Sequence, residues 1–353
     1  MKILRIGSDR VIGPGRRVLV IAEIGVNHDG SPGRALDLVR FAHRGGADAV
    51  KVQLFSADRL VHSSAALATY QRERLKDKEQ TAGEMLRKYE LPVEELARVV
   101  ALVRQSAMTP MATPFSESDL ETIEKLDLPA IKIASPDIVN RPLLEAAAKT
   151  KRPMLVSTGA ATPEEIELAA RWLNDAQAKF ALLHCVSAYP TEVADANLCW
   201  IEELSKKYDV PVGFSDHTTE MTAGALAVAS GATIVEKHLT YDRSAAGPDH
   251  AASANPGDFA KYVSGVRVAE AMRGQPGKKV LDCERDVRRL SRQSLVIGRD
   301  VAAGQLIKRE DLKVQRPGTG VPAAEFMRVV GKKSKRTLSA GTMLQWDMLS
   351  DAA

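Results

Sequence analysis

Two histidines stand where short apolar runs of the chain end. The run 212–215 is followed by Asp216 and His217, and the run 233–237 is followed by His238. The segment between the runs carries apolar residues at helical spacing, so the unit reads as strand, helix and strand. A right-handed crossover makes two such strands parallel and near neighbours. We therefore expect both imidazoles at one carboxyl-terminal edge of a sheet.

Carboxylates accompany both histidines. Asp216 directly precedes His217, Glu236 lies two residues before His238, and Asp249 follows in a turn. Either histidine alone is most simply a capping or hydrogen-bonding residue at a strand end. The pair with these acids favours a divalent metal site with His217 and His238 as ligands. Imidazole and carboxylate ligands without a thiolate cluster suit Mn²⁺, Co²⁺, Fe²⁺ or Mg²⁺ as well as Zn²⁺.

A ring of polar side chains is expected at the same edge, because the other apolar runs also end in polar residues. Two lysines and several hydroxyls suit a phosphate and a carboxylate, since ammonium groups neutralise an anion and hydroxyl and N–H groups orient it. A lysine near a strand end is usually only a surface residue, but a buried, unpaired Glu23 would be costly. The ring consists of Glu23, Lys51, Gln53, Thr113, Lys132, Ser135, Asp137, Ser157, Thr158, His184, Ser187 and Tyr189.

Eight apolar runs with strand character alternate with helical patterns through the first three quarters of the chain. The candidate strands are 18–22, 49–54, 109–112, 130–133, 154–157, 180–185, 212–215 and 233–237. The candidate helices are 32–44, 93–106, 117–126, 142–149, 163–174, 198–207, 220–229 and 256–272. Eight such units predict a (β/α)₈ TIM barrel, which carries its chemistry at the carboxyl ends of its strands.

Two stretches fall outside this alternation. The polar stretch 56–90 is too long for an ordinary connection and should fold over the barrel mouth as a lid or form an oligomer contact. After residue 274 the composition changes, which predicts a linker over 275–292, basic and partly helical, and a β-rich module over 293–353. Within that module we expect a strand at 295–297 and a short helix at 307–312. The barrel domain is then 1–274.

The overall composition is that of an ordinary soluble globular protein. The chain has 353 residues, is 44% hydrophobic and 27% charged, and carries a net charge of +4. Aromatic residues make up only 5%, which argues against nucleic-acid binding, so the basic residues favour a solvated surface or an anionic small substrate. The three cysteines form no disulfide framework, and no apolar run reaches membrane-spanning length. We expect a cytoplasmic protein with no membrane anchor.

The chain resembles the sialic acid synthases, the phosphoenolpyruvate-condensing enzymes that make nonulosonic acids. The resemblance covers nearly the whole chain, and the terminal module is similar to that family's antifreeze-like (SAF) domain. The motifs that carry it are Ala22-Glu23-Ile24-Gly25-Val26-Asn27-His28-Asp29-Gly30, Lys51-Val52-Gln53, Ala112-Thr113-Pro114-Phe115, Lys132-Ile133-Ala134-Ser135, Ser157-Thr158-Gly159, His184-Cys185, Tyr189-Pro190-Thr191, Ser215-Asp216-His217-Thr218, Glu236-Lys237-His238, Gly247-Pro248-Asp249-His250 and Arg316-Pro317-Gly318-Thr319-Gly320.

The resemblance implies a role for each matching residue. His217 and His238 would bind the metal, usually Mn²⁺, with Mg²⁺ or Co²⁺ as further possibilities. Glu23 and Tyr189 would lie near the sugar, and Asp249 near the metal or the acceptor hydroxyls. Arg316 would reach from the terminal module of one subunit into the barrel of its partner in a domain-swapped homodimer. The residues implied to hold phosphoenolpyruvate are Lys51, Thr113, Lys132, Ser135, Ser157 and Ser215.

Two residues depart from the pattern of the family members that use N-acetylmannosamine. Ser187 replaces an Asn before the Tyr-Pro motif, and Asp137 replaces a Glu. Both positions belong to the sugar pocket, so the acceptor is either N-acetylmannosamine or a related open-chain amino sugar, giving a sialic acid of the N-acetylneuraminate type. Alternatively it is a 2,4-diacetamido-trideoxy hexose, giving legionaminic or pseudaminic acid. The competing functions are a 3-deoxy sugar-acid phosphate synthase, a metal-dependent pyruvate aldolase and a non-catalytic barrel scaffold.

Overall fold

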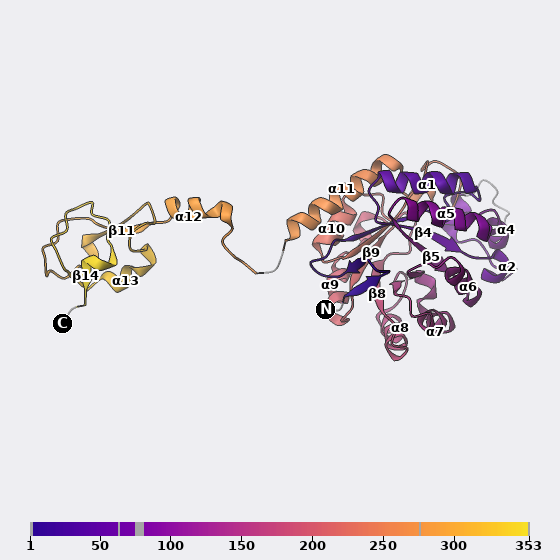
Figure 1. Ribbon diagram of the computed structural model, residues 1–353, viewed down its shortest axis with the longest axis horizontal. Coiled ribbons are helices and arrows are strands. Elements are labelled where there is room, and N and C mark those ends of the chain that lie inside the picture. The colour runs from indigo at the N-terminus through magenta and orange to yellow at the C-terminus, as the bar shows by residue number, and fades with distance from the viewer. Residues whose placement is uncertain (1–2, 63, 75–80, 275–276, 352–353) are drawn as a thin grey trace. The chain divides into compact units, whose positions relative to one another are not determined.

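The computed structural model describes residues 3–62, 64–74, 81–274 and 277–351. It divides into two compact units, Met1–Gln275 and Pro276–Ala353 (Figure 1). In the first unit eight parallel strands form a closed barrel in the order β10-β3-β4-β5-β6-β7-β8-β9, which confirms the predicted (β/α)₈ fold. The barrel strands are β3 (Leu19–Glu23), β4 (Ala49–Leu54), β5 (Thr109–Pro114), β6 (Ile131–Ile133), β7 (Met154–Ser157), β8 (Phe180–Cys185), β9 (Val212–Asp216) and β10 (Ile234–His238).

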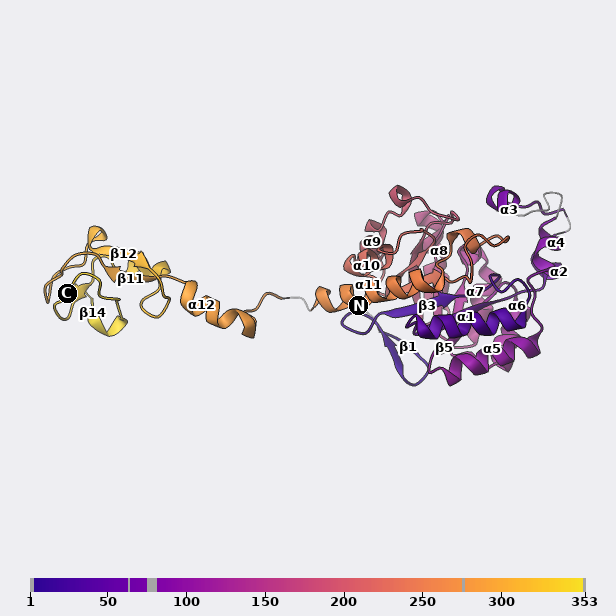
Figure 2. The same cartoon turned by 90° about the horizontal axis from the view of Figure 1, so that it is seen from above.

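Helices surround the barrel, and their start signals lie in the sequence (Figures 1 and 2). Helix α8 begins after Thr162, which forms a capping box with Glu165, and α11 begins after Asn255, whose side chain accepts from Asp258 N. None of the described helices is long and apolar enough to cross a membrane. The helices that follow the strands are α1 (Pro32–Arg44), α5 (Val93–Gln105), α6 (Glu117–Lys125), α7 (Arg141–Lys149), α8 (Pro163–Asp175), α9 (Cys199–Lys207), α10 (Ala223–Ala229) and α11 (Pro256–Arg273).

Strand alternation divides the core into two layers. On β3, Val20 and Ala22 pack outward against the helices, whereas Leu19 and Ile21 pack into the barrel interior. The interior at this level is wholly apolar, and it consists of Leu19, Ile21, Ala49, Met111, Ala130, Leu155, Ala181, Leu183 and Ile234. Two residues further along each strand the inward positions become polar or ionisable: Glu23, Lys51, Thr113, Lys132, Ser157, Cys185, Ser215 and Glu236. The barrel thus has an apolar floor below a polar site.

An amino-terminal hairpin closes the opposite end of the barrel. Strands β1 (Leu4–Ile6) and β2 (Arg10–Ile12) pair antiparallel, and Leu4, Ile6 and Ile12 join the interior apolar cluster. Sequence analysis assigned no structure to these residues. The hairpin keeps water from the lower mouth, so the polar residues of the upper level have solvent on one side only.

The described residues of the stretch 56–90 form short helices, and several of them line the cavity at the upper mouth, which confirms the predicted place of this stretch. These helices are α2 (Ala57–Leu60), α3 (Thr69–Arg74) and α4 (Ala82–Arg87). Leu67, Ala82, Met85 and Tyr89 form a small apolar cluster with Val26, which belongs to the loop after β3. In Figure 2, α3 and β1 lie far apart, in keeping with their places at the two ends of the barrel. The role of this stretch as an oligomer contact stays a prediction.

The second unit is a small module with its own core. Helix α12 (Arg285–Ser291) follows a 3₁₀ turn (η4, Asp282–Glu284), which confirms helical structure in the basic stretch. Strand β11 (Ser294–Ile297) pairs antiparallel with β12 (Leu312–Gln315), and β13 (Lys333–Ser334) with β14 (Leu349–Ser350). A short helix, α13 (Phe326–Val329), completes the unit, whose core includes Leu295, Val301 and Leu344.

The helix predicted over 307–312 is wrong. Only a 3₁₀ turn, η5 (Arg309–Asp311), forms there, and β12 begins at Leu312. The reason is tertiary: Leu312 pairs with Ile297 in the β11–β12 ladder, so the chain is extended from Leu312 onward. Ile307 is buried in the core of the module, although it does not belong to a helix.

A buried carboxylate, that of Asp48, contacts the first barrel strand (β3), the last barrel helix (α11) and the amino-terminal hairpin. Asp48, just before β4, accepts from Val20 N at 2.9 Å and pairs with Arg267 of α11. Its other oxygen lies 3.2 Å from Arg10 Nη1 of β2 and 3.3 Å from Arg17 Nε. Because Asp48 is only 6% exposed, its loss would leave Val20 N without its acceptor and Arg267 with Glu270 as its only described acidic partner.

We predict that Asp48→Ala lowers the free energy of unfolding of the barrel by about 3 kcal/mol, the range for breaking a buried ion pair. Urea denaturation followed by tryptophan fluorescence measures this loss, in a Trp346→Phe background that leaves only the barrel tryptophans. The control is Asp37→Ala, because the exposed Asp37 only pairs with Arg40 along α1. Its loss should cost less than about 0.5 kcal/mol. Equal losses in the two variants would contradict the proposed role of Asp48.

Candidate active site

A cavity of about 390 Å³ opens at the carboxyl ends of the barrel strands. Its wall combines strand residues with residues of the stretch 56–90. Most of the predicted site residues line it, namely Lys51, Thr113, Lys132, Ser135, Ser157, Tyr189, Ser215, His217, His238 and Asp249. The structure therefore brings together side chains that lie up to nearly two hundred residues apart in the sequence.

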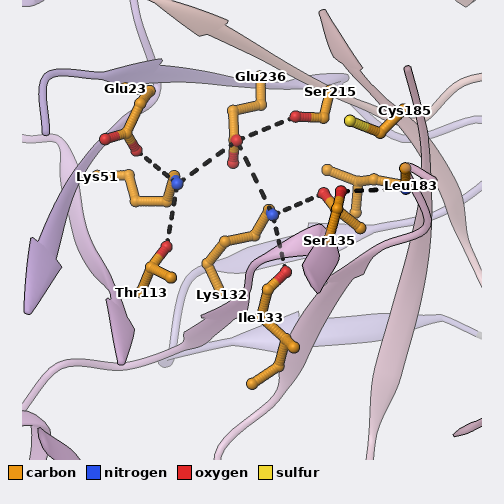
Figure 3. Close-up of polar contacts among 12 residues, drawn as sticks. Glu23, Lys51, Thr113, Lys132, Ile133, Ser135, Leu183, Cys185, Ser215 and Glu236 are labelled. Carbon is orange, nitrogen blue, oxygen red and sulfur yellow. Dashed lines mark hydrogen bonds and ion pairs between the residues drawn. The ribbon is translucent and has the colours of Figure 1, made fainter. Parts of the chain in front are cut away.

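Two lysine ammonium groups converge on one carboxylate in the floor of the cavity (Figure 3). Lys51 Nζ lies 3.5 Å and Lys132 Nζ 3.9 Å from Glu236 Oε1, and Ser215 Oγ donates to the same oxygen at 3.2 Å. Lys51 also pairs with Glu23 Oε2 at 2.5 Å. Three donors thus point at one position between β4, β6 and β9.

The hydroxyl groups of the predicted ring surround the two lysines. Lys51 donates to Thr113 Oγ1 at 3.0 Å, and Lys132 donates to Ser157 Oγ at 2.6 Å. Ser135 Oγ accepts from Gly159 N at 3.0 Å. A side chain at Gly159 would collide with Ser135 Oγ, because its Cβ would lie 2.8 Å from that oxygen. The glycine thus lets the backbone after β7 approach the site closely.

The charges of the floor support one another. Burial alone would raise the pKa of Glu236, but Lys132 and Lys51 outweigh it and hold that pKa below its usual value. Burial would likewise lower the pKa of Lys51, but Glu23 and Glu236 raise it on balance. Burial lowers the pKa of Lys132, and Glu236 offsets this only in part. The floor therefore holds an ionised Glu236 beside a firmly charged Lys51.

The two predicted metal ligands lie beside each other above this floor. The ring centroids of His217 and His238 are 5.3 Å apart, and the ring of Tyr189 lies 4.1 Å from that of His217. Burial, together with His217 and Lys51, holds the pKa of His238 well below its usual value. His238 is therefore neutral, the form in which an imidazole binds a metal.

The nitrogens of both imidazoles suit a metal ion. His217 Nδ1 lies 2.9 Å from the carbonyl oxygen of Val186, which can only accept, so Nδ1 carries a proton and Nε2 is the nitrogen that could bind a metal. Burial would lower the pKa of His217, but the neighbouring Cys185 raises it on balance, so a metal would have to displace a proton there. His238 Nδ1 is buried without a hydrogen-bond partner and lies 3.4 Å from Asp249 Oδ2. Among the described residues no group of three His, Cys, Asp or Glu side chains is placed to hold a metal. The two imidazoles fit a metal whose remaining ligands are substrate or water.

The acids that flank the histidines in sequence do not surround them in space. Asp216 faces away from the cavity and pairs with Lys237, so its expected place beside the metal ligands is wrong. Glu236 faces inward but lies with the two lysines. Only Asp249 reaches a histidine, and burial raises its pKa to about 6 against the opposing effect of His217. Alternation along each strand separates the neighbours Asp216 and His217 onto opposite faces.

Some residues of the expected ring lie outside the cavity wall. His184 faces outward, stacks on Phe214 and lies 2.8 Å from the carbonyl oxygen of Ala196, so its place in the ring is wrong. Asp137 accepts from Asn140 at 3.1 Å in a 3₁₀ turn (η1, Ser135–Val139). Ser187 is exposed, and Arg316 is an exposed residue of the second unit. Neither Asp137 nor Ser187 is part of the described wall.

Sequence analysis missed two kinds of site residue: the inward-facing Glu236 and Cys185, and the apolar residues of the outer wall. Glu236 was read only as a neighbour of His238, although an inward His238 places Glu236 on the same face two residues earlier. Cys185 lines the cavity beside His217. The other group forms the outer, apolar wall and had no chemical signal: Phe55, Leu60, Val61, Ala65, Met85, Leu86 and Phe115.

Comparison with known proteins identifies the family of the chain. The model of the NeuB family matches residues 38–278, and the model of the SAF domain matches residues 292–350. The N,N'-diacetyllegionaminic acid synthase of Legionella pneumophila is 38% identical over 352 residues, covering 97% of this chain and 99% of its own. The pseudaminic acid synthase of Campylobacter jejuni is 32% identical over 331 residues, covering 94% and 96%.

A solved structure extends the likeness to the fold. The N-acetylneuraminic acid (sialic acid) synthetase of Leptospira borgpetersenii, crystallised with citrate, superposes with a TM-score of 0.72 at 33% identity. The match covers 81% of this chain and 95% of that one. The chain belongs to the NeuB family, that of the sialic acid synthases, and combines a (β/α)₈ barrel with a terminal SAF domain.

Proposed function

We propose that this protein condenses phosphoenolpyruvate with an open-chain 2,4-diacetamido-trideoxy hexose and water, giving a nonulosonic acid of the legionaminic type and phosphate. One observation carries the proposal. Two buried lysine side chains, Lys51 and Lys132, converge on one point next to the paired imidazoles of His217 and His238. An anion and a metal-bound oxygen would thus be held in adjacent places.

The floor of the cavity supports phosphoenolpyruvate as one substrate. Glu236 Oε1 marks a position that Lys51, Lys132 and Ser215 all approach. The phosphate and carboxylate oxygens of the substrate would share these donors and those of the surrounding hydroxyls. Ammonium groups in a site with little water attract an anion more strongly than they would in solution. The proposed phosphate and carboxylate ligands are Lys51, Thr113, Lys132, Ser135, Ser157 and Ser215.

The reaction joins two carbon atoms and breaks one C–O bond. C3 of phosphoenolpyruvate attacks the aldehyde carbon of the sugar, and the aldehyde oxygen takes up a proton. Water then adds at the cationic C2 and loses a proton, and the C–O bond to phosphate breaks. The residues mainly bring the two substrates into register, which itself supplies much of the rate.

Glu236 is the group best placed to receive the proton from water. Its Oε1 is occupied by three donors, but its Oε2 is buried and accepts no hydrogen bond in the structure. The lysines keep this carboxylate ionised. We assign Glu236 the role of general base in water addition and Tyr189 a place beside the sugar.

The two imidazoles are the proposed metal ligands, with Asp249 next to them. His217 Nε2 and His238 would hold Mn²⁺, with Mg²⁺ or Co²⁺ as alternatives. When bound, the ion would polarise the aldehyde oxygen of the acceptor. The buried Asp249 would hold the acceptor hydroxyls near that aldehyde.

The outer wall supports a deoxygenated, acetylated acceptor. Phe55, Leu60, Val61 and Met85 face the cavity, and such surfaces suit acetamido methyl groups and a methyl carbon at C6. No arginine lines the described wall, and its only lysines are Lys51 and Lys132 of the floor. A 6-phosphate on the acceptor would therefore meet no cation of the same subunit in the described outer wall.

The terminal module supports a dimer in which Arg316 completes the partner's site. Arg316 is exposed, and a guanidinium binds carboxylate and phosphate groups by paired hydrogen bonds. We propose a domain-swapped homodimer, as the resemblance implied, in which each Arg316 serves the barrel of the other subunit.

Phosphate release tests the proposed function. We predict release with Mn²⁺, phosphoenolpyruvate and a 2,4-diacetamido-trideoxy hexose, with kcat/KM about 10- to 200-fold above that for N-acetylmannosamine, because apolar groups fill the outer wall. N-Acetylmannosamine 6-phosphate is the matched negative substrate. Preference for N-acetylmannosamine would reverse the acceptor assignment. If phosphoenolpyruvate binds but none of the tested sugars leads to phosphate release, a non-catalytic scaffold is favoured.

The proposed metal site predicts a specific loss in His238→Ala. Turnover dependent on Mn²⁺ should fall by several orders of magnitude, because a metal supplies several kcal/mol of stabilisation in the transition state. The control is His184→Gln, which removes an outward imidazole two strands away. It should lower the thermal midpoint and leave the Mn²⁺ dependence unchanged. Full activity of His238→Ala with the same dependence would rule out the assignment.

Mixing two inactive variants tests the swapped dimer. Arg316→Ala and His238→Ala chains, refolded together, form mixed dimers in which one of the two sites has both residues if the arm crosses. About a quarter of the wild-type rate should return, since half of the randomly formed dimers are mixed. If Arg316 served its own barrel, the mixture would show no more activity than the separate variants.

A further inference from the structure

A fully buried ion pair lies directly behind the two histidines, outside the cavity. Lys237 Nζ is 3.1 Å from Asp216 Oδ2, and both side chains have no exposed surface. The pair faces outward from β9 and β10, and Lys237 lies 5.5 Å from the ring centroid of Tyr262 on α11. Neither residue lines the cavity, so neither contacts substrate.

This pair is the last rung of the ladder between the two strands. Asp216 and Lys237 are register partners, and β9 ends at Asp216. Each residue directly precedes one histidine. His217 and His238 therefore lie just beyond the point where backbone hydrogen bonds hold β9 against β10.

The pair also holds the chain on both sides of His217. Lys237 donates to the carbonyl oxygen of Thr218, and Asp216 Oδ1 accepts from Thr218 N at 2.8 Å. Lys237 thus contacts the residues on both sides of His217, namely Asp216 and Thr218. The backbone of His217 has little freedom to move relative to β10.

The other described backbone contacts join each histidine to its outer neighbours. The carbonyl oxygen of His217 accepts from Thr191 N at 3.0 Å, on the side of β8. The carbonyl oxygen of His238 accepts from Ala254 N at 2.8 Å, on the side of α11. Beyond the end of the backbone ladder, Asp216 and Lys237 therefore link β10 to the segment that carries His217.

Stability alone does not account for two charges in this place. Replacing a buried ion pair by apolar residues of similar volume is often neutral or stabilising. The surroundings are also shaped around the pair: a Cβ at Gly224 would lie 2.3 Å from Tyr262 Cζ, so α10 leaves room for this ring beside Lys237. Geometry, and not stability, is what the pair contributes.

We propose that the Asp216–Lys237 pair is a positioning device that sets the separation of the two metal-binding imidazoles. It acts through the backbone of His217 and His238 and touches neither metal nor substrate. This inference rests on the proposed metal-binding role of the two histidines. Residues that orient metal ligands typically change metal affinity 10- to 100-fold when they are replaced.

The test separates metal affinity from stability in the full-length protein. In Asp216→Leu/Lys237→Met, the dissociation constant for Mn²⁺, measured from the electron paramagnetic resonance signal of the free ion, should rise about 10- to 100-fold. The urea midpoint without metal should equal or exceed that of the wild type. The control, Val212→Ala, truncates an outward core residue at the other end of β9. It should lower the midpoint and leave the Mn²⁺ affinity unchanged.

Wild-type Mn²⁺ affinity in the folded double variant would overturn the inference. If that variant does not fold, Asp216→Asn/Lys237→Met takes its place with the same expected rise, and wild-type affinity there would equally overturn it. Absence of Mn²⁺ binding by the wild-type protein is a different result, because it would refute the metal site itself.

Discussion

Two lysine side chains stay buried and charged inside this barrel only because carboxylates lie beside them. The side chains of Lys51 and Lys132 are 6% and 3% exposed, and an isolated ammonium group would lose its proton at such a depth. Glu236 serves both lysines through one oxygen, and Glu23 adds a second partner for Lys51. The apolar level below and the hairpin that closes it keep water from reaching these charges from beneath. The anion site therefore depends on the complete barrel.

Much of this arrangement could be predicted from local patterns. The alternation of apolar runs with amphipathic segments predicted eight βα units, since each unit buries its strand and one helix face in a similar way. The same reasoning placed Lys51, Lys132 and the two histidines at one end of the barrel. It did not reveal Glu236 as a partner of both lysines. That requires knowing which face of β10 points inward, and the periodicity of two then settles it.

Other features had no local signal. The hairpin formed by β1 and β2 is stable only because Leu4, Ile6 and Ile12 cover the barrel interior, a contact made with strands distant in sequence. Asp216 and His184 resembled site residues because polar groups near strand ends were read without regard to face. The 307–312 stretch forms only a 3₁₀ turn, because Leu312 pairs with Ile297 in a strand ladder that joins segments distant in the sequence.

The site has two parts that can change independently. Its charged floor stands on strand residues whose positions are fixed by the barrel ladder, so a substitution there disturbs several neighbours. Its apolar wall comes largely from the long connection after β4, where changes leave the ladder intact. Relatives named for different nonulosonic acids align with this chain at 38% and 32% identity over nearly its whole length. A shared floor with a variable wall is the simplest physical account of one condensation with several acceptors.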